Sequence, residues 1–137
     1  MLKKLQNKKG FTLMEMLIVV AIIAILVAIM IPTLTTQLER ARETADIANI
    51  RSAYAEAMVN ALTSDNGTGE ATTEAMTQTT AGFKYVTDIP AYLKNNGTET
   101  TTNWANTCNT ATKGQTITVT VNNEGIITYK VNAKVGG

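Results

Sequence analysis

The chain has 137 residues, of which 45% are apolar and 17% are charged, with one cysteine and no histidine. This length accommodates one small domain and one membrane segment. A single cysteine excludes an internal disulfide, and the lack of histidine excludes a Cys–His catalytic pair. The sequence also has no glycine-rich phosphate loop and no cluster of metal ligands. We therefore expect a protein that is not an enzyme and that holds no metal or cofactor.

Residues 1–10 form a short basic leader that contains no acidic residue. Its cations are Lys3, Lys4, Lys8 and Lys9. The rest of the chain is net acidic, so the near-neutral overall charge hides a marked asymmetry. By the positive-inside rule, such a leader stays in the cytoplasm and the chain that follows the apolar segment lies outside. The sequence predicts a single-pass membrane protein with its N-terminus inside.

Residues 11–32 form an apolar segment in which Glu15 is the only charged residue. As a helix that rises about 1.5 Å per residue, this segment spans the roughly 30 Å of membrane hydrocarbon. A charged side chain at the centre of such a helix costs roughly 2.5–3.5 kcal/mol on insertion scales. Glu15 therefore needs a neutralising partner or a position near a membrane face. In a plain membrane anchor, Glu15 would simply complement the dipole at the start of the helix.

The residues around the start of this segment are Lys8-Lys9-Gly10-Phe11-Thr12-Leu13-Met14-Glu15. This sequence resembles the processing site of type IV prepilins. The resemblance covers residues 8 to about 40 tightly, and Pro32 also matches a proline common in that family. It implies cleavage after Gly10 by a prepilin peptidase and N-methylation of Phe11. It also implies the α+β type IV pilin fold, in which a long N-terminal helix packs on a small antiparallel sheet.

Cleavage after Gly10 would give the spacing of Phe11 and Glu15 a physical purpose. The new α-amine has a pKa near 8 and is largely protonated at neutral pH. Glu15 lies one helical turn further along, where it can meet the Phe11 amine of a neighbouring helix that is offset along the axis. Loss of one member of a buried ion pair costs about 3–5 kcal/mol. Our hypothesis is that the contact between Phe11 and Glu15 sets the assembly register.

Pro32 has no amide N–H, and its ring crowds the carbonyl of Ala28. The sequence therefore predicts a kink or local opening of the helix there. In the family, this region can unwind when the subunit packs into a filament. The β-branched residues before the proline make an extended backbone less unfavourable. These residues are Ile22, Ile23, Ile25, Val27, Ile29 and Ile31.

Residues 33–62 predict an amphipathic continuation of the helix, with two apolar stripes at helical spacing. We expect one stripe to face other subunits and one to face the domain. The first stripe consists of Leu34, Leu38, Ala41, Ala45 and Ala48. The other consists of Ile47, Ile50, Tyr54, Ala57 and Ala61. The charges between the stripes predict a solvated face, and they are Glu39, Arg40, Arg42, Glu43, Asp46 and Arg51. Because acids interleave with the arginines, we expect no direct binding of nucleic acid.

Residues 63–137 predict a globular head with a variable loop and a C-terminal antiparallel sheet. Residues 63–69 are a cluster of turn formers that predicts a helix stop, and residues 70–76 have the length of one or two helical turns. Residues 115–121 and 127–131 alternate as a hairpin around a turn at 122–125, with an apolar face for the 47–61 stripe. Further strands are expected at 83–87 and 102–107. The other expected core residues are Phe83, Tyr85, Ile89, Tyr92, Leu93 and Trp104.

The resemblance implies a structural subunit, the major pilin of an extracellular type IV pilus. Its partners would be other copies in a helical filament, minor pilins, the peptidase, the assembly machinery and, before assembly, the membrane. Adhesion and twitching motility are roles that such a filament implies. The lone Cys108 favours a Gram-positive source, because many Gram-negative pilins carry a C-terminal disulfide. The alternatives are a pseudopilin of a type II secretion or competence system and a membrane-anchored binding domain.

Overall fold

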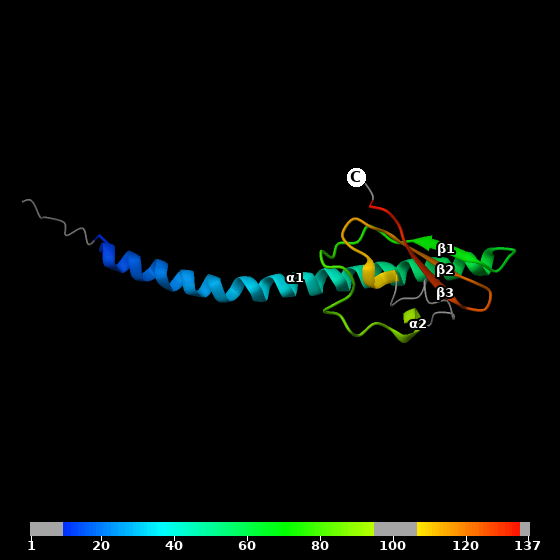
Figure 1. The fold of residues 1–137 in the computed structure, drawn as a ribbon, viewed down its shortest axis with the longest axis horizontal. Coiled ribbons are helices and arrows are strands. Elements are labelled where there is room, and N and C mark those ends of the chain that lie inside the picture. Colours follow the sequence, from blue (N-terminus) through cyan, green and yellow to red (C-terminus); the bar gives the residue numbers. More distant parts are fainter. Residues whose placement is uncertain (1–9, 95–106, 135–137) are drawn as a thin grey trace, which may run out of the picture. The chain divides into compact units, whose positions relative to one another are not determined.

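The computed structural model describes residues 10–94 and 107–134 (Figure 1). The chain divides into two compact units, Met1–Thr36 and Gln37–Gly137. Helix α1 spans Leu13–Thr63 and contributes to both units. The second unit also contains β1 (Gly69–Thr72), α2 (Ala91–Lys94), the short 3-10 helix η1 (Cys108–Thr110), β2 (Ile117–Val121) and β3 (Ile127–Val131). These elements give the predicted α+β fold, in which a long N-terminal helix packs on a small antiparallel sheet.

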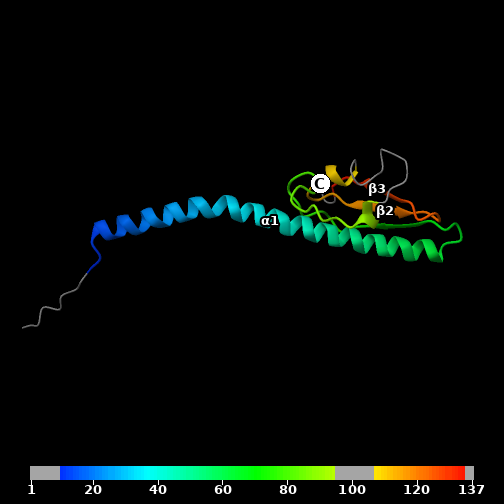
Figure 2. The same cartoon turned by 90° about the horizontal axis from the view of Figure 1, so that it is seen from below.

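The sheet has the order β1-β2-β3, and both pairings are antiparallel. Within the second unit it lies along the C-terminal half of α1, as the two perpendicular views agree (Figures 1 and 2). Val119 in the central strand is paired with Ala71 on one side and with Tyr129 on the other. The predicted hairpin is therefore confirmed, with its turn closed by a hydrogen bond from the Gly125 amide to the Asn122 carbonyl.

The core of the head forms where the inner face of α1 meets the inner face of this sheet. Its fully or almost fully buried members include Ile50, Ala53, Ala57, Ile117, Val119, Val121, Ile127 and Tyr129. Each large aliphatic side chain buried in this way contributes roughly 1.5–3 kcal/mol. The prediction that the hairpin covers the 47–61 stripe is thus confirmed. The Tyr129 hydroxyl also donates a hydrogen bond to the Leu93 carbonyl, which ties α2 to the sheet.

Two predictions of secondary structure in the head are wrong. The segment expected to form helical turns supplies β1 instead, because residues 69–72 pair with β2. Residues 83–87, expected to form a strand, lie in no strand, because the amides of Lys84, Tyr85 and Val86 bind a side chain of α1 and not a neighbouring strand.

The remaining predictions for the head have mixed outcomes. Leu93 is fully buried as expected, and Phe83, Tyr85 and Ile89 are partly buried. Tyr92 was expected in the core, but it retains 47% of its surface and packs its ring against Tyr54. Trp104 and nearly all of the strand expected at 102–107 lie outside the described residues.

Candidate functional site

The start of α1 is a capping box built by Thr12 and Glu15. The Thr12 amide and hydroxyl both donate hydrogen bonds to Glu15 Oε2, at 2.7 and 2.8 Å. In return, the Glu15 amide donates to Thr12 Oγ1 at 3.2 Å. This reciprocal arrangement satisfies amides that a helix start otherwise leaves without partners. The structure thus gives Glu15 a local role, while its second oxygen, Oε1, has no hydrogen-bond partner among the described residues.

The two residues that flank the predicted cleavage point are both exposed. Phe11 retains 81% of its accessible surface, and a β-carbon placed at Gly10 would meet nothing within 4 Å. Nothing in the described part of the chain shields this peptide bond from an enzyme. The lysines of the leader lie outside the described residues.

The apolar part of α1 that follows is unburied along its length. A window of 18 residues in this helix has a mean hydropathy of 3.1, and none of the window is covered by the rest of the protein. The core helix of a soluble domain would instead be mostly buried. By length and composition, this segment is able to cross a membrane.

Pro32 lies inside α1, which continues through it without a break. The hydroxyls of Thr35 and Thr36 donate to the Pro32 carbonyl at 2.9 and 3.1 Å, so local side chains support the backbone just after the proline. Such back-bonding by threonine is a usual accompaniment of bends in helices. The subunit is therefore helical here, and unwinding inside a filament stays a prediction.

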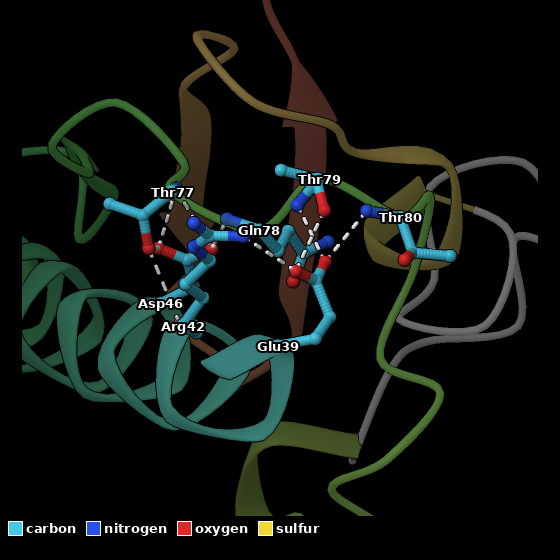
Figure 3. A network of polar contacts seen from close by, with 7 residues as sticks. All are labelled: Glu39, Arg42, Asp46, Thr77, Gln78, Thr79 and Thr80. Atoms are coloured by element: carbon cyan, nitrogen blue, oxygen red, sulfur yellow. Dashed lines mark hydrogen bonds and ion pairs between the residues drawn. The ribbon is translucent and has the colours of Figure 1, made fainter. Parts of the chain in front are cut away.

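Three carboxylates, Glu39, Glu43 and Asp46, project from one face of α1 into the head, and we call them the acid ladder. Their exposed fractions are 5%, 0% and 0%, so the prediction that these charges form a solvated face is wrong for all three. All three bind backbone amides of the segment 77–86, which has no regular secondary structure. Figure 3 shows Glu39 and Asp46 of α1 pointing toward Thr77, Gln78, Thr79 and Thr80.

Each rung of the acid ladder holds a different part of the segment. Asp46 accepts from the Thr77 amide at 2.9 Å and from the Gln78 amide at 2.8 Å. Glu43 accepts from the amides of Lys84, Tyr85 and Val86 at 3.0, 2.8 and 2.8 Å. Charge-assisted bonds of this kind are the stronger ones in proteins, at about 1.5–3 kcal/mol each. The ladder therefore replaces the strand pairing that would otherwise satisfy these amides.

Glu39 is the rung with an ionic partner. It accepts the Thr79 hydroxyl at 2.7 Å and the Thr80 amide at 2.7 Å, and it forms an ion pair with Arg42 at 3.2 Å. Asp46 lies four residues after Arg42, but it binds the Thr77–Gln78 backbone instead. Because only one cation faces three buried carboxylates in the described region, hydrogen bonds carry most of their stabilisation.

We expect the head to lose stability as the pH falls through the acid range. Burial disfavours the charge of Glu39, but bonds from Thr80, Thr79 and Arg42 outweigh burial and lower its pKa from 4.5 to about 2. A folded-state pKa below the unfolded value means that this stabilisation is present above about pH 4.5 and is lost as the pH falls through about 2. In urea unfolding followed by near-UV circular dichroism, the urea concentration at the midpoint is expected to decrease as the pH is lowered from about 4.5 to about 2. Glu39→Gln should flatten this dependence, and an unchanged pH profile in that variant would contradict the assignment.

The two apolar stripes of α1 have opposite fates in the head. Ile47, Ile50 and Ala57 are buried against the sheet. Leu38, Ala41, Ala45 and Ala48 are exposed, and Leu38 retains 48% of its surface. The expectation that one stripe serves the domain is confirmed, and the other stripe is left without a partner in the subunit.

The described residues hold no arrangement suited to catalysis. They contain no group of three or more histidines, cysteines or acids placed to hold a metal ion. Cys108 is fully buried, and burial raises the pKa of its thiol far above the usual range, which makes it a poor nucleophile. One cavity of about 450 Å³ lies beside the C-terminal end of α1 and the β2–β3 turn, and it is lined mainly by small and polar residues.

Comparison with known proteins bears on the N-terminal region. Residues 5–31 match the prokaryotic N-terminal methylation motif. The chain is 58% identical over 40 residues to the type IV wide pilus major component PilA4 of Thermus thermophilus, an alignment that covers 29% of this chain and 30% of that protein. It is 54% identical over 56 residues to the type IV narrow pilus major component PilA5 of the same organism, which covers 39% of this chain and 48% of the relative.

The chain thus matches less than half the length of either relative, and no solved structure matches it. Both relatives are named as components of pili, which is a structural role and not an enzymatic one. The matched region contains the capping box, the exposed Gly10–Phe11 bond and the unburied apolar helix. The N-terminal segment of this chain therefore carries the N-terminal methylation motif and is similar to that of type IV pilus major components.

Proposed function

We propose that this chain is the major structural subunit of an extracellular type IV pilus. The precursor is held in the membrane by residues 11–32, with residues 1–10 inside and the head outside. A prepilin peptidase removes the leader after Gly10 and methylates Phe11. The assembly machinery then stacks copies into a helical filament, with the apolar helices at its centre, residues 33–62 as the amphipathic continuation and residues 63–137 as the outer head. The observation that carries this proposal is the methylation motif on an apolar helix that nothing in the subunit covers.

The geometry of the capping box refines the proposed role of Glu15. Its Oε2 is used by Thr12 of the same chain, and its Oε1 has no partner among the described residues. In a filament, Oε1 is then the atom that receives the Phe11 amine of a neighbouring subunit. The same carboxylate can therefore fix its own helix start and pair with the amine of the next copy. Without that amine, a carboxylate inside a helix bundle would remain uncompensated.

The N-terminus and intact mass of the protein in surface-sheared material test processing and polymerisation together. We expect a chain that begins at methylated Phe11 in a filament fraction. An intact Met1, or protein found only in membranes, would contradict the proposal. Long, abundant filaments would identify a pilus, whereas short or scarce ones would favour a pseudopilus of a secretion or competence system. The names of the two relatives favour the pilus.

A second prediction concerns Glu15 itself. Glu15→Val is expected to be processed at Gly10 but to yield at least about tenfold fewer filaments, because the neighbour's amine loses its partner inside the bundle. Glu124→Gln, which changes an exposed glutamate of the turn between β2 and β3, is the control in this filament assay. Normal filament yield from correctly processed Glu15→Val would contradict the assembly role of Glu15.

A Gram-positive source, expected from the single cysteine, stays a prediction that the two relatives do not test.

A further inference from the structure

The exposed apolar stripe of α1 extends much further than the sequence pattern first indicated. Within the head unit it comprises Leu38, Ala41, Ala45, Ala48, Ser52, Ala55, Val59 and Leu62, and we call this set the outer heptad stripe. All members except Ser52 are apolar, and they recur at steps of three and four, which is the a/d pattern of a coiled-coil seam. Every member is exposed, and Val59 and Leu62 retain 58% and 82% of their surface. Apolar side chains repeated in this way on one helix face are typical of a surface that another helix covers.

The residues that flank the outer heptad stripe argue for a second copy of this chain as the partner. On one flank lie Gln37, Thr44, Arg51 and Met58, and on the other lie Arg42, Asn49, Glu56 and Thr63. In a parallel pair of helices in register, each residue of the first flank lies beside the residue five positions later on the partner. The resulting pairs are Gln37 with Arg42, Thr44 with Asn49, Arg51 with Glu56, and Met58 with Thr63. None of them brings like charges together.

Arg51 and Glu56 supply the charge complementarity. Both side chains belong to exposed residues, and neither forms an ion pair with any described residue of its own chain. They are five residues apart, so they do not face each other on one helix, where neighbours are three or four apart. Across a parallel pair, Arg51 of each copy meets Glu56 of the other, and the contact occurs twice by symmetry. Charges at such flanking positions set partner choice and orientation in coiled coils.

The membrane step of the proposed function supplies the orientation, and the inference rests on it in this respect. Copies inserted in one direction by the same apolar segment are parallel and lie at the same depth. The small residues at the centre of the stripe then allow two helix backbones to approach closely. We propose that, before assembly, two copies of this chain pair in parallel and in register along the outer heptad stripe, with Arg51 of each bound to Glu56 of the other.

Disulfide trapping in membranes tests this pairing on the full-length chain. The host lacks pilus assembly genes, and Cys108→Ala provides a cysteine-free background. Ala48→Cys places one thiol on the stripe, where it would face its own counterpart, and Arg40→Cys places an exposed thiol off the stripe as the control. After oxidation with copper phenanthroline, we expect at least about fivefold more covalent dimer from Ala48→Cys. Equal yields from the two variants, or a product of Ala48→Cys that contains a different protein, would overturn the proposal.

Charge reversal in the Ala48→Cys protein provides the sharper test. Arg51→Glu alone and Glu56→Arg alone each place like charges together at both symmetric contacts, so each should lower the dimer yield about fivefold. The two changes combined recreate the opposite-charge pair and should restore the yield, which a folding defect would not do. Lys130→Glu, an exposed charge reversal on β3, should leave the yield unaltered. Single reversals without effect, or a double variant that stays low, would refute the Arg51–Glu56 contact.

Different results would contradict the proposed function and the proposed pairing. A chain that begins at Phe11 in filaments, combined with equal trapping at Ala48 and Arg40, would leave the pilus subunit intact and remove only the pairing.

Discussion

Glu43→Gln is expected to lower the free energy of unfolding of the head by at least about 3 kcal/mol. The Glu43 side chain is completely buried and receives the amides of Lys84, Tyr85 and Val86. Glutamine keeps the volume but presents an amide group, which is itself a donor, to at least one of these N–H groups. A buried donor left without an acceptor costs about 1–3 kcal/mol, and the loss of charge also weakens the remaining bonds.

The single buried cysteine offers a direct readout of this change. Cys108 becomes accessible to thiol reagents only when the head opens, so labelling of the full-length protein in detergent across a urea series gives the unfolding midpoint. Glu124→Gln is the matched control, because the same substitution at an exposed site of the head should alter stability by less than about 0.5 kcal/mol. Equal midpoints for the two variants would show that the hydrogen bonds from Glu43 to residues 84–86 do not stabilise the head.

Gly69→Ala is expected to be comparably damaging, through steric overlap and not through a lost bond. A β-carbon at Gly69 would lie 1.9 Å from the Ala57 carbonyl oxygen and 2.2 Å from the Ala61 amide nitrogen. Both atoms belong to the backbone of α1, so no side-chain rotation relieves the overlap, and β1 has to move away from the helix. Overpacking of this kind typically costs 1–3 kcal/mol, and a backbone clash this close is expected to cost at least about 3 kcal/mol.

Gly125→Ala separates this steric effect from the conformational effect of losing a glycine. Gly125 has a φ of +77°, but a β-carbon there would meet nothing within 4 Å. It should therefore cost only about 1–2 kcal/mol of left-handed strain. The Cys108 labelling assay compares the two variants directly. A smaller loss for Gly69→Ala than for Gly125→Ala would mean that β1 does not approach α1 as closely as described.

Hydrophobic periodicity was sufficient to predict the parts of this fold whose burial repeats regularly. The steps of three and four in residues 47–61 gave the buried face of α1, and the alternation in 117–121 and 127–131 gave the hairpin that covers it. The N-terminal methylation motif was likewise recognisable, because its residues lie close together in the sequence.

The acid ladder was missed because its partners are backbone amides more than thirty residues away, and such donors leave no signature in a sequence. A signal was nevertheless present. Continuing the buried stripe from Ile47 and Ile50 toward the N-terminus in steps of four leads to Glu43, Glu39 and Asp46. Carboxylates that occupy the inward face of a helix must find donors there, since an unpaired buried charge is too costly. Strand β1 was missed because its Gly-Glu-Ala-Thr sequence lacks the regular apolar alternation of a strand, and only its pairing with β2 shows it to be one.

The way Glu43 holds its segment has an evolutionary consequence. Its carboxylate contacts Lys84, Tyr85 and Val86 through their amide groups alone, and every residue except proline carries an amide. The identities of these side chains are therefore not constrained by the anchor, although the path of the chain is. The chemistry of such a surface can therefore change by substitution of these side chains, while the helix beneath it needs no compensating change.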